Sequence, residues 1–156
     1  MSSSSLKDKL ASFIEAVWDR GDVEAAGNYI ATAYTIHHDP GDLWEGRSLD
    51  LDGFKDRVRL SRAPFPDQRF DIQQMCEDGA AISMNWLWRA THLADIPGFS
   101  ATGRTIQMSG STTYFFNSEE RLAGHWQITD RLGVWRQLKV NLDAQACATK
   151  RPLSTT

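Results

Sequence analysis

The order of the predicted elements restricts the fold most, because helices come first and long strands follow. Apolar residues recur at helical spacing from Leu6 to Val17, and further helices are predicted at about 23–32 and 51–62. After Asp67 the chain changes to extended runs separated by turn-forming residues, at 69–76, 80–92, 105–117 and 121–139. This segregation predicts a single α+β domain with an antiparallel-rich sheet.

Long strands curled around a helix leave a cone with one open mouth, where a ligand would bind. Along the run 80–92, alternate positions place Ile82, Trp86 and Trp88 on one face and polar residues on the other. Six tryptophans are many for a chain of 156 residues. Either this aromatic face is ordinary core packed on the helices, or part of it, such as Trp88 together with Trp44, lines a pocket.

The last predicted strand contains the largest group of side chains that could take part in catalysis or binding. It combines the imidazole of His125, the indole of Trp126, the carboxamide of Gln127 and the carboxylate of Asp130. An acid or base acts on a small organic molecule where water is excluded and the proton lies within hydrogen-bond reach. The alternative is structural: Trp126 belongs to the core, and Asp130 caps a turn or pairs with a nearby arginine.

Four histidines show no metal-ligand pattern, because the adjacent His37 and His38 would point to opposite sides of a strand. No metal is therefore predicted. His92 and His125, at strand ends, are candidates for proton transfer. The sequence contains no Gly-rich phosphate loop, dinucleotide fingerprint or Ser-centred elbow, so we expect no cofactor and no covalent catalysis.

The charge pattern gives no reason to expect nucleic acid as a partner. The net charge is −3, and the basic residues around 55–62 alternate with aspartates, which favours a solvated helix face. No apolar run is long enough to span a bilayer, and Cys76 and Cys147 suggest no disulfide framework. We expect a cytoplasmic protein that binds no membrane, with one domain at 1–143 and a flexible tail at 144–156.

Several short motifs follow one another along the chain: Trp18-Asp19-Arg20-Gly21-Asp22, Tyr34 with His38-Asp39-Pro40, Gly46-Arg47, Ala63-Pro64-Phe65-Pro66-Asp67, Thr91-His92, Thr102-Gly103-Arg104, and His125-Trp126 to Asp130 with Arg136-Gln137-Leu138. From about Leu6 to Leu138 the sequence thereby resembles the SnoaL-like polyketide cyclases, or ester cyclases, of the NTF2-like superfamily. The resemblance implies a cone-shaped α+β barrel, in which a curved mixed or antiparallel sheet wraps around N-terminal helices. It also implies a hydrophobic cavity, no cofactor, and a homodimer or homotetramer.

The resemblance implies an intramolecular aldol condensation, in which a carboxylate on the last strand removes a carbon-bound proton from a polyketide ester. An ungapped alignment through Arg136-Gln137-Leu138 puts that carboxylate at Gln127, which cannot exchange a proton, whereas Asp130 matches a second recurrent aspartate. We therefore expect Asp130, His92 or His125 as catalytic residues.

Two hypotheses follow. The first is an enzyme that performs cofactor-independent cyclisation, isomerisation or dehydration on a small hydrophobic carbonyl compound; the second is a non-catalytic module that binds a small molecule. The residues expected to contact that molecule are His38, Trp44, Trp88, Phe99, Tyr114, Trp126 and Gln127.

Overall fold

The computed structural model describes residues 5–149, with side chains described up to residue 140. The chain begins with α1 (Leu6–Phe13), where the Ser5 hydroxyl and the Asp8 carboxylate form a capping box. A π-helix, η1 (Ile14–Asp19), continues α1 directly. The first predicted helix is thereby confirmed.

The second predicted helix is wrong in its last residues. A short 3₁₀ helix, η2 (Val23–Asn28), is followed at once by strand β1 (Ile30–His38). Along β1 the side chains of Ile30, Tyr34 and Ile36 are buried, and β-branched and aromatic residues suit a strand with a buried face. β1 therefore takes residues that the sequence assigned to a helix.

The third predicted helix is confirmed. After the short strand β2 (Ser48–Leu49), α2 (Leu51–Arg62) begins where the Asp50 carboxylate accepts a hydrogen bond from the amide of Gly53. The helix ends at Arg62; Ala63 still has helical backbone angles, but Pro64 has no amide hydrogen with which to continue the helical hydrogen bonds.

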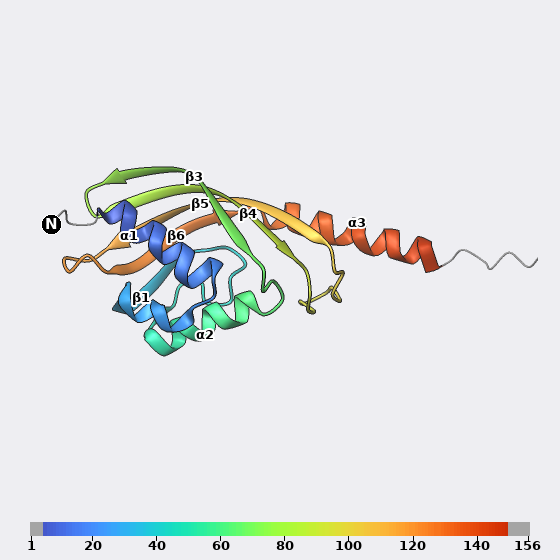
Figure 1. Ribbon diagram of the computed structural model, residues 1–156, viewed down its shortest axis with the longest axis horizontal. Coiled ribbons are helices and arrows are strands. Elements are labelled where there is room, and N and C mark those ends of the chain that lie inside the picture. The colour runs from blue at the N-terminus through green and yellow to red at the C-terminus, as the bar shows by residue number, and fades with distance from the viewer. Residues whose placement is uncertain (1–4, 150–156) are drawn as a thin grey trace, which may run out of the picture.

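Four long strands complete the sheet: β3 (Arg69–Asp78), β4 (Ala81–Thr91), β5 (Thr105–Phe116) and β6 (Leu122–Thr129). The strand order is β2-β1-β6-β5-β4-β3, and the pairing is antiparallel except between β1 and β6, which are parallel. The sheet is curved and open, and α1 and α2 lie on the same side of it (Figure 1). The predicted α+β fold with a curved mixed sheet wrapped around N-terminal helices is confirmed.

The core lies between the concave face of the sheet and these helices. Burial alternates along β4, and Ile82, Met84 and Trp86 are buried as the sequence pattern predicted. Phe13 of α1 and Phe54 of α2 meet inside, with ring centroids 6.0 Å apart. The aromatic face of β4 thus serves as core in its first half.

The last predicted strand, 121–139, is wrong in its second half. β6 ends at Thr129, and α3 (Arg131–Thr149) follows. The Asp130 carboxylate accepts a hydrogen bond from the amide of Gly133 at 2.8 Å, which satisfies a free donor of the first helical turn. Asp130 therefore caps the first turn of α3, a structural role of the kind that the sequence offered as one alternative.

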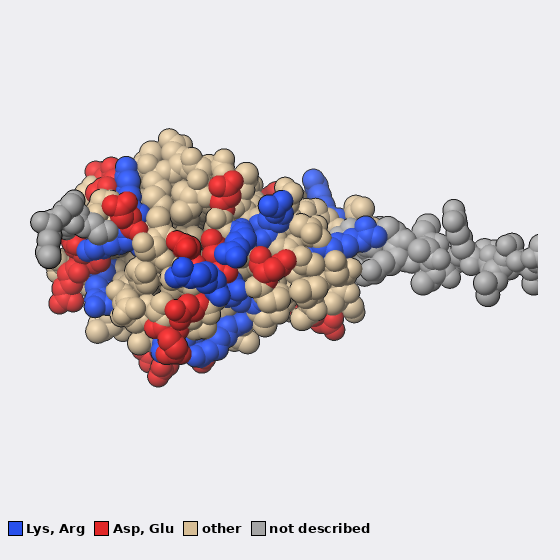
Figure 2. Space-filling model, in the orientation of Figure 1, with Lys and Arg blue, Asp and Glu red and all other residues tan. Residues whose placement is uncertain are grey.

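α3 begins against β5 and then extends away from the body of the domain (Figure 1). Residues 144–149 of the predicted tail are helical, and the remainder of that tail, 150–156, lies outside the described residues. Within the described part of the chain, no helix is both long and apolar enough to cross a membrane. Acidic and basic side chains are intermixed on the face shown in Figure 2.

Candidate active site

A cavity of about 700 Å³ opens on the concave side of the sheet, between α2, the β4–β5 loop and the first turns of α3. Most of its lining is aromatic or aliphatic, which suits a hydrophobic ligand. Six of the residues expected from the sequence line it: Trp44, Trp88, Phe99, Tyr114, His125 and Gln127. The predicted apolar cavity is present, and contact of these residues with a ligand stays a prediction.

Three other candidates lie outside this lining. His38 and Trp126 stack on each other, with ring centroids 4.7 Å apart and planes at 14°, and Trp126 is exposed. His92 is buried, its ring lies 5.5 Å from that of Phe65, and its Nδ1 accepts a hydrogen bond from the amide of Thr102. The structure therefore does not bring these three together with the cavity.

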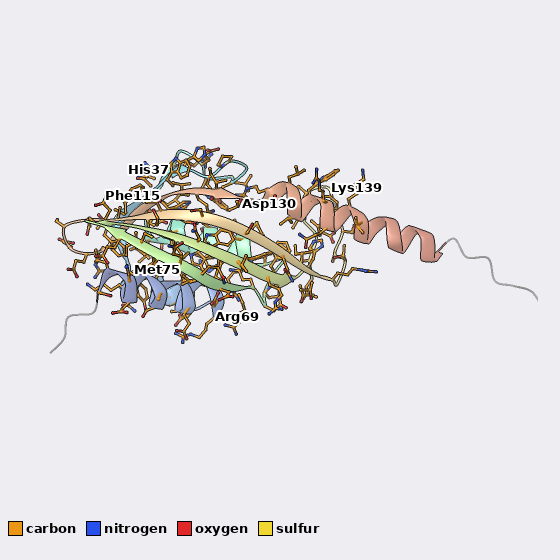
Figure 3. All side chains as sticks on the ribbon, turned by 90° about the horizontal axis from the view of Figure 1, so that it is seen from above. His37, Arg69, Met75, Phe115, Asp130 and Lys139 are labelled. Carbon is orange, nitrogen blue, oxygen red and sulfur yellow. The ribbon has the colours of Figure 1, made fainter. Side chains whose placement is uncertain are left out.

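Asp130 also lies away from the cavity lining. Figure 3 places it at the junction of β6 and α3, where its exposed carboxylate caps the helix. Its predicted role as the catalytic carboxylate remains untested. Three other aspartates line the cavity, Asp39, Asp42 and Asp95.

Asp39 is the centre of the polar end of the cavity, and its side chain is only 1% exposed. Its Oδ1 accepts a hydrogen bond from Arg131 at 2.7 Å. Its Oδ2 is reached by Gln127 at 3.0 Å, by Arg57 at 3.3 Å and by Nε2 of His125 at 3.4 Å. One buried carboxylate thus collects donors from α2, β6 and α3.

The parallel pairing of β1 with β6 explains this convergence. In the register, His38 is paired with Trp126, so Asp39, which follows β1 directly, lies beside the end of β6. Trp126 points outward, and alternation therefore turns its neighbours His125 and Gln127 inward, toward Asp39.

Arg57 corrects the sequence interpretation of the basic segment 55–62. Instead of belonging to a solvated face, it is 5% exposed and lies over the ring of Trp18. Its second anionic partner is Asp42, at 2.9 Å. Burial lowers the pKa of Arg57, but the charges of Asp42, Tyr34 and Asp39 and the hydrogen bond to Asp42 together outweigh burial and raise the pKa. Arg57 is therefore a permanent cation at the cavity.

Asp39 is ionised in this setting. Burial alone raises its pKa, but the hydrogen bond from His125 and the charges of Arg131 and Arg57 outweigh burial and hold the pKa at about 2.

His125 is held between Asp39 and Tyr34, whose hydroxyl lies 2.7 Å from Nδ1. Burial lowers the pKa of His125, so the imidazole is neutral near pH 7. Since a carboxylate can only accept, the ring proton is assigned to Nε2, and Nδ1 then accepts from Tyr34. Both ring nitrogens are occupied.

Gln127 is fixed by a chain of hydrogen bonds. The indole of Trp86 donates to the Thr112 hydroxyl at 2.9 Å, which donates to Oε1 of Gln127 at 2.6 Å. The carboxamide nitrogen then donates to Asp39. This series of hydrogen bonds fixes the orientation of the Gln127 carboxamide, because the ionised carboxylate of Asp39 accepts only from the amide nitrogen.

The neutral, buried state of His125 predicts a loss of stability in acid. Its folded pKa lies below the unfolded value, so its contribution is present above about pH 6.5 and is lost as the pH falls below that value. We expect the melting temperature to fall between pH 7 and pH 5, by about 2–4 °C for each kcal/mol lost. His125→Gln should reduce this fall, and the exposed His37→Gln should not; equal falls in both variants would contradict the assignment.

Comparison with known proteins identifies the family to which the chain belongs. Residues 8–138 match the family model of the SnoaL-like polyketide cyclases. The chain belongs to this family. The resemblance inferred from the sequence motifs is thereby confirmed. Curated protein sequences give no match.

Solved structures agree with this assignment. A proposed polyketide cyclase from Acidithiobacillus ferrooxidans is 57% identical, with a TM-score of 0.85 over 90% of this chain and 99% of that one. IdmH, a proposed polyketide cyclase from Streptomyces antibioticus, is 27% identical, with a TM-score of 0.74 over 86% and 99%. AclR, a proposed hydroxylase from Streptomyces galilaeus, is 14% identical with a TM-score of 0.70 over 87% and 98%, and shows the shared fold alone.

The sequence did not predict several of the residues at the polar end of the cavity. Asp39, Arg57 and Arg131 were not predicted as site residues, and neither was Tyr34. One signal was available for Arg57: it shares the buried stripe of α2 with Phe54 and Val58. A charged residue on an apolar helix face requires a buried partner.

Proposed function

We propose that this chain is a cofactor-independent enzyme that moves a carbon-bound proton of a small, hydrophobic, polyketide-like carbonyl compound. Such a transfer begins an aldol-type cyclisation, an isomerisation or a dehydration. The observation that carries the proposal is Asp39, an ionised carboxylate buried at the polar end of an otherwise apolar cavity. Family membership is in keeping with chemistry of this class.

The two oxygens of Asp39 are held differently. The buried Arg57 and His125 and the partly buried Gln127 donate to Oδ2, whereas Oδ1 is held by Arg131, whose side chain is 43% exposed. A substrate that displaces the guanidinium from Oδ1 would expose its lone pairs. It would also remove one of the charges that lower the pKa, which makes Asp39 a stronger base. We therefore assign proton abstraction to Oδ1.

His125 and Gln127 are positioning residues in this proposal. Each donates to Oδ2 of Asp39; Nδ1 of His125 already accepts from Tyr34, and the carboxamide of Gln127 is not a base that can take a substrate proton. The proposal thereby changes the role expected for His125 from a base to a support. The aromatic walls would hold a flexible substrate folded for reaction and exclude water, which raises the effective concentration of the reacting groups.

The test is solvent deuterium exchange into a bound 1,3-dicarbonyl compound, followed by mass spectrometry. We expect Asp39→Asn to slow exchange at least about a hundredfold, the usual scale of general acid–base catalysis, because a carboxamide cannot accept the proton. Asp130→Asn should keep the parent rate, since asparagine caps a helix as well as aspartate does. Melting curves of both variants would verify the fold.

Two results would contradict the proposal. Loss of exchange in Asp130→Asn, with exchange kept in Asp39→Asn, would establish the base expected from the sequence. Exchange no faster with the parent protein than with buffer, despite binding of the dicarbonyl, would favour the non-catalytic binding module.

A further inference from the structure

Tyr114 presents a hydroxyl group that the mechanism above does not use. The residue lines the cavity and is 7% exposed. Within the described residues, no hydrogen-bond partner is found for its hydroxyl, and this oxygen is not among the fully buried unpaired atoms, so it is accessible from the cavity. A buried donor without a partner costs free energy, and a ligand oxygen would recover it.

The position of Tyr114 places this donor at the polar end. On β5 it pairs in register with His125 on β6, and the two rings lie 6.1 Å apart. Burial raises the pKa of Tyr114 well above its ordinary value, the charge of Arg57 lowers it in part, and the charge of Asp39 raises it further. The hydroxyl therefore keeps its proton and donates without transferring it.

Tyr34 also lines the cavity, but its hydroxyl differs from that of Tyr114 in having a hydrogen-bond partner. The residue is also buried, at 1% exposed, and its hydroxyl donates a hydrogen bond to Nδ1 of His125. Two tyrosines thus lie at the same end of the cavity, one supporting the network behind Asp39 and the other open to a ligand.

We infer that Tyr114 is a catalytic residue that donates a hydrogen bond to the carbonyl oxygen of the substrate; the inference rests on the proposed function. The proton on carbon moves to Oδ1 of Asp39, and the electron pair of the C–H bond forms the new C=C bond. The π pair of the carbonyl becomes the lone pair of an enolate oxygen, which the Tyr114 hydroxyl and the nearby positive charge of Arg57 stabilise. The substrate class is accordingly a ketone or ester with an acidic α-proton.

The direct test uses 2-naphthol, whose naphtholate resembles an enolate and has its own ultraviolet spectrum. Binding is measured to Asp39→Asn, in which the neutral carboxamide stands for the protonated base, and to Asp39→Asn with Tyr114→Phe. We expect the second substitution to lower the ratio of bound naphtholate to bound naphthol about tenfold or more, since the lost hydrogen bond is to a charged oxygen. An unchanged ratio would overturn the inference.

A second measurement does not depend on Asp39→Asn. In the deuterium-exchange assay, Tyr114→Phe alone should slow exchange about tenfold or more, while Tyr29→Phe, outside this cavity, should keep the parent rate. Equal rates in parent and Tyr114→Phe would count against a catalytic role. If Asp39→Asn retains exchange while Tyr114→Phe lowers the naphtholate ratio, the assigned base fails and the Tyr114 hydrogen bond stands.

Discussion

Replacing Asp39 with alanine is expected to destabilise the fold by about 3–5 kcal/mol. The substitution leaves Arg57 buried with Asp42 as its remaining anionic partner, and removing one member of a buried ion pair costs more than the pair contributes. The loss should be near the lower end of this range, because Asp42 still compensates part of the charge. Urea unfolding at pH 7 would measure it.

Arg131→Ala is the matched control, because it breaks the other ion pair of the same carboxylate. The Arg131 side chain is 43% exposed, and ion pairs with an exposed partner contribute about 0–1 kcal/mol. We expect a clear difference between the two variants. Equal and small losses would mean that water in the cavity solvates Arg57 and that the Asp39 network is not a source of stability.

The elements that the sequence predicted are those set by local periodicity. The helix at 51–62 and the strands β3, β4 and β5 follow from which neighbouring residues share a buried face. α3 was missed because Val134 and Trp135 favour strands, and their propensity outweighed the helical spacing of Val134 and Leu138. Reading Asp130 as part of a strand also made it look like a site residue.

The centre of the site depends on contacts that local patterns cannot reveal. Asp39 is followed by Pro40 and Gly41 and therefore looks like a turn residue. Its partners His125 and Gln127 lie 86 and 88 residues further along the chain, and only the parallel pairing of β1 with β6 brings them together. The sequence could show that polar residues occur at strand ends, but not which of them meet.

A single glycine leaves room for Trp86, the first donor in the series of hydrogen bonds that leads through Thr112 and Gln127 to Asp39. Gly110 lies in the middle of β5, opposite Trp86, and a Cβ atom built there would lie 2.3 Å from Cζ2 of the indole. Trp86 is buried and donates to Thr112, the hydroxyl that orients Gln127. A glycine inside a strand often marks such a close approach.

We expect Gly110→Ala to destabilise the protein by about 1–3 kcal/mol, the cost of overpacking a filled core. Gly27→Ala is the control: its added Cβ would meet Leu51 at 3.5 Å, an ordinary contact, so stability should change little. Both are measured by urea unfolding.

A double-mutant cycle isolates the cause. Trp86→Phe removes the atoms that clash, so Gly110→Ala should cost much less in that background than in the parent. Trp86→Phe also removes the indole donor, which should leave the Thr112 hydroxyl and the Gln127 carboxamide less firmly oriented. Deuterium exchange should therefore slow in Trp86→Phe by more than the stability lost on truncating a buried side chain explains, which urea unfolding of the same variant would measure. If Gly110→Ala is equally costly in both backgrounds, the loss does not come from the indole, and the strand itself requires glycine at this position.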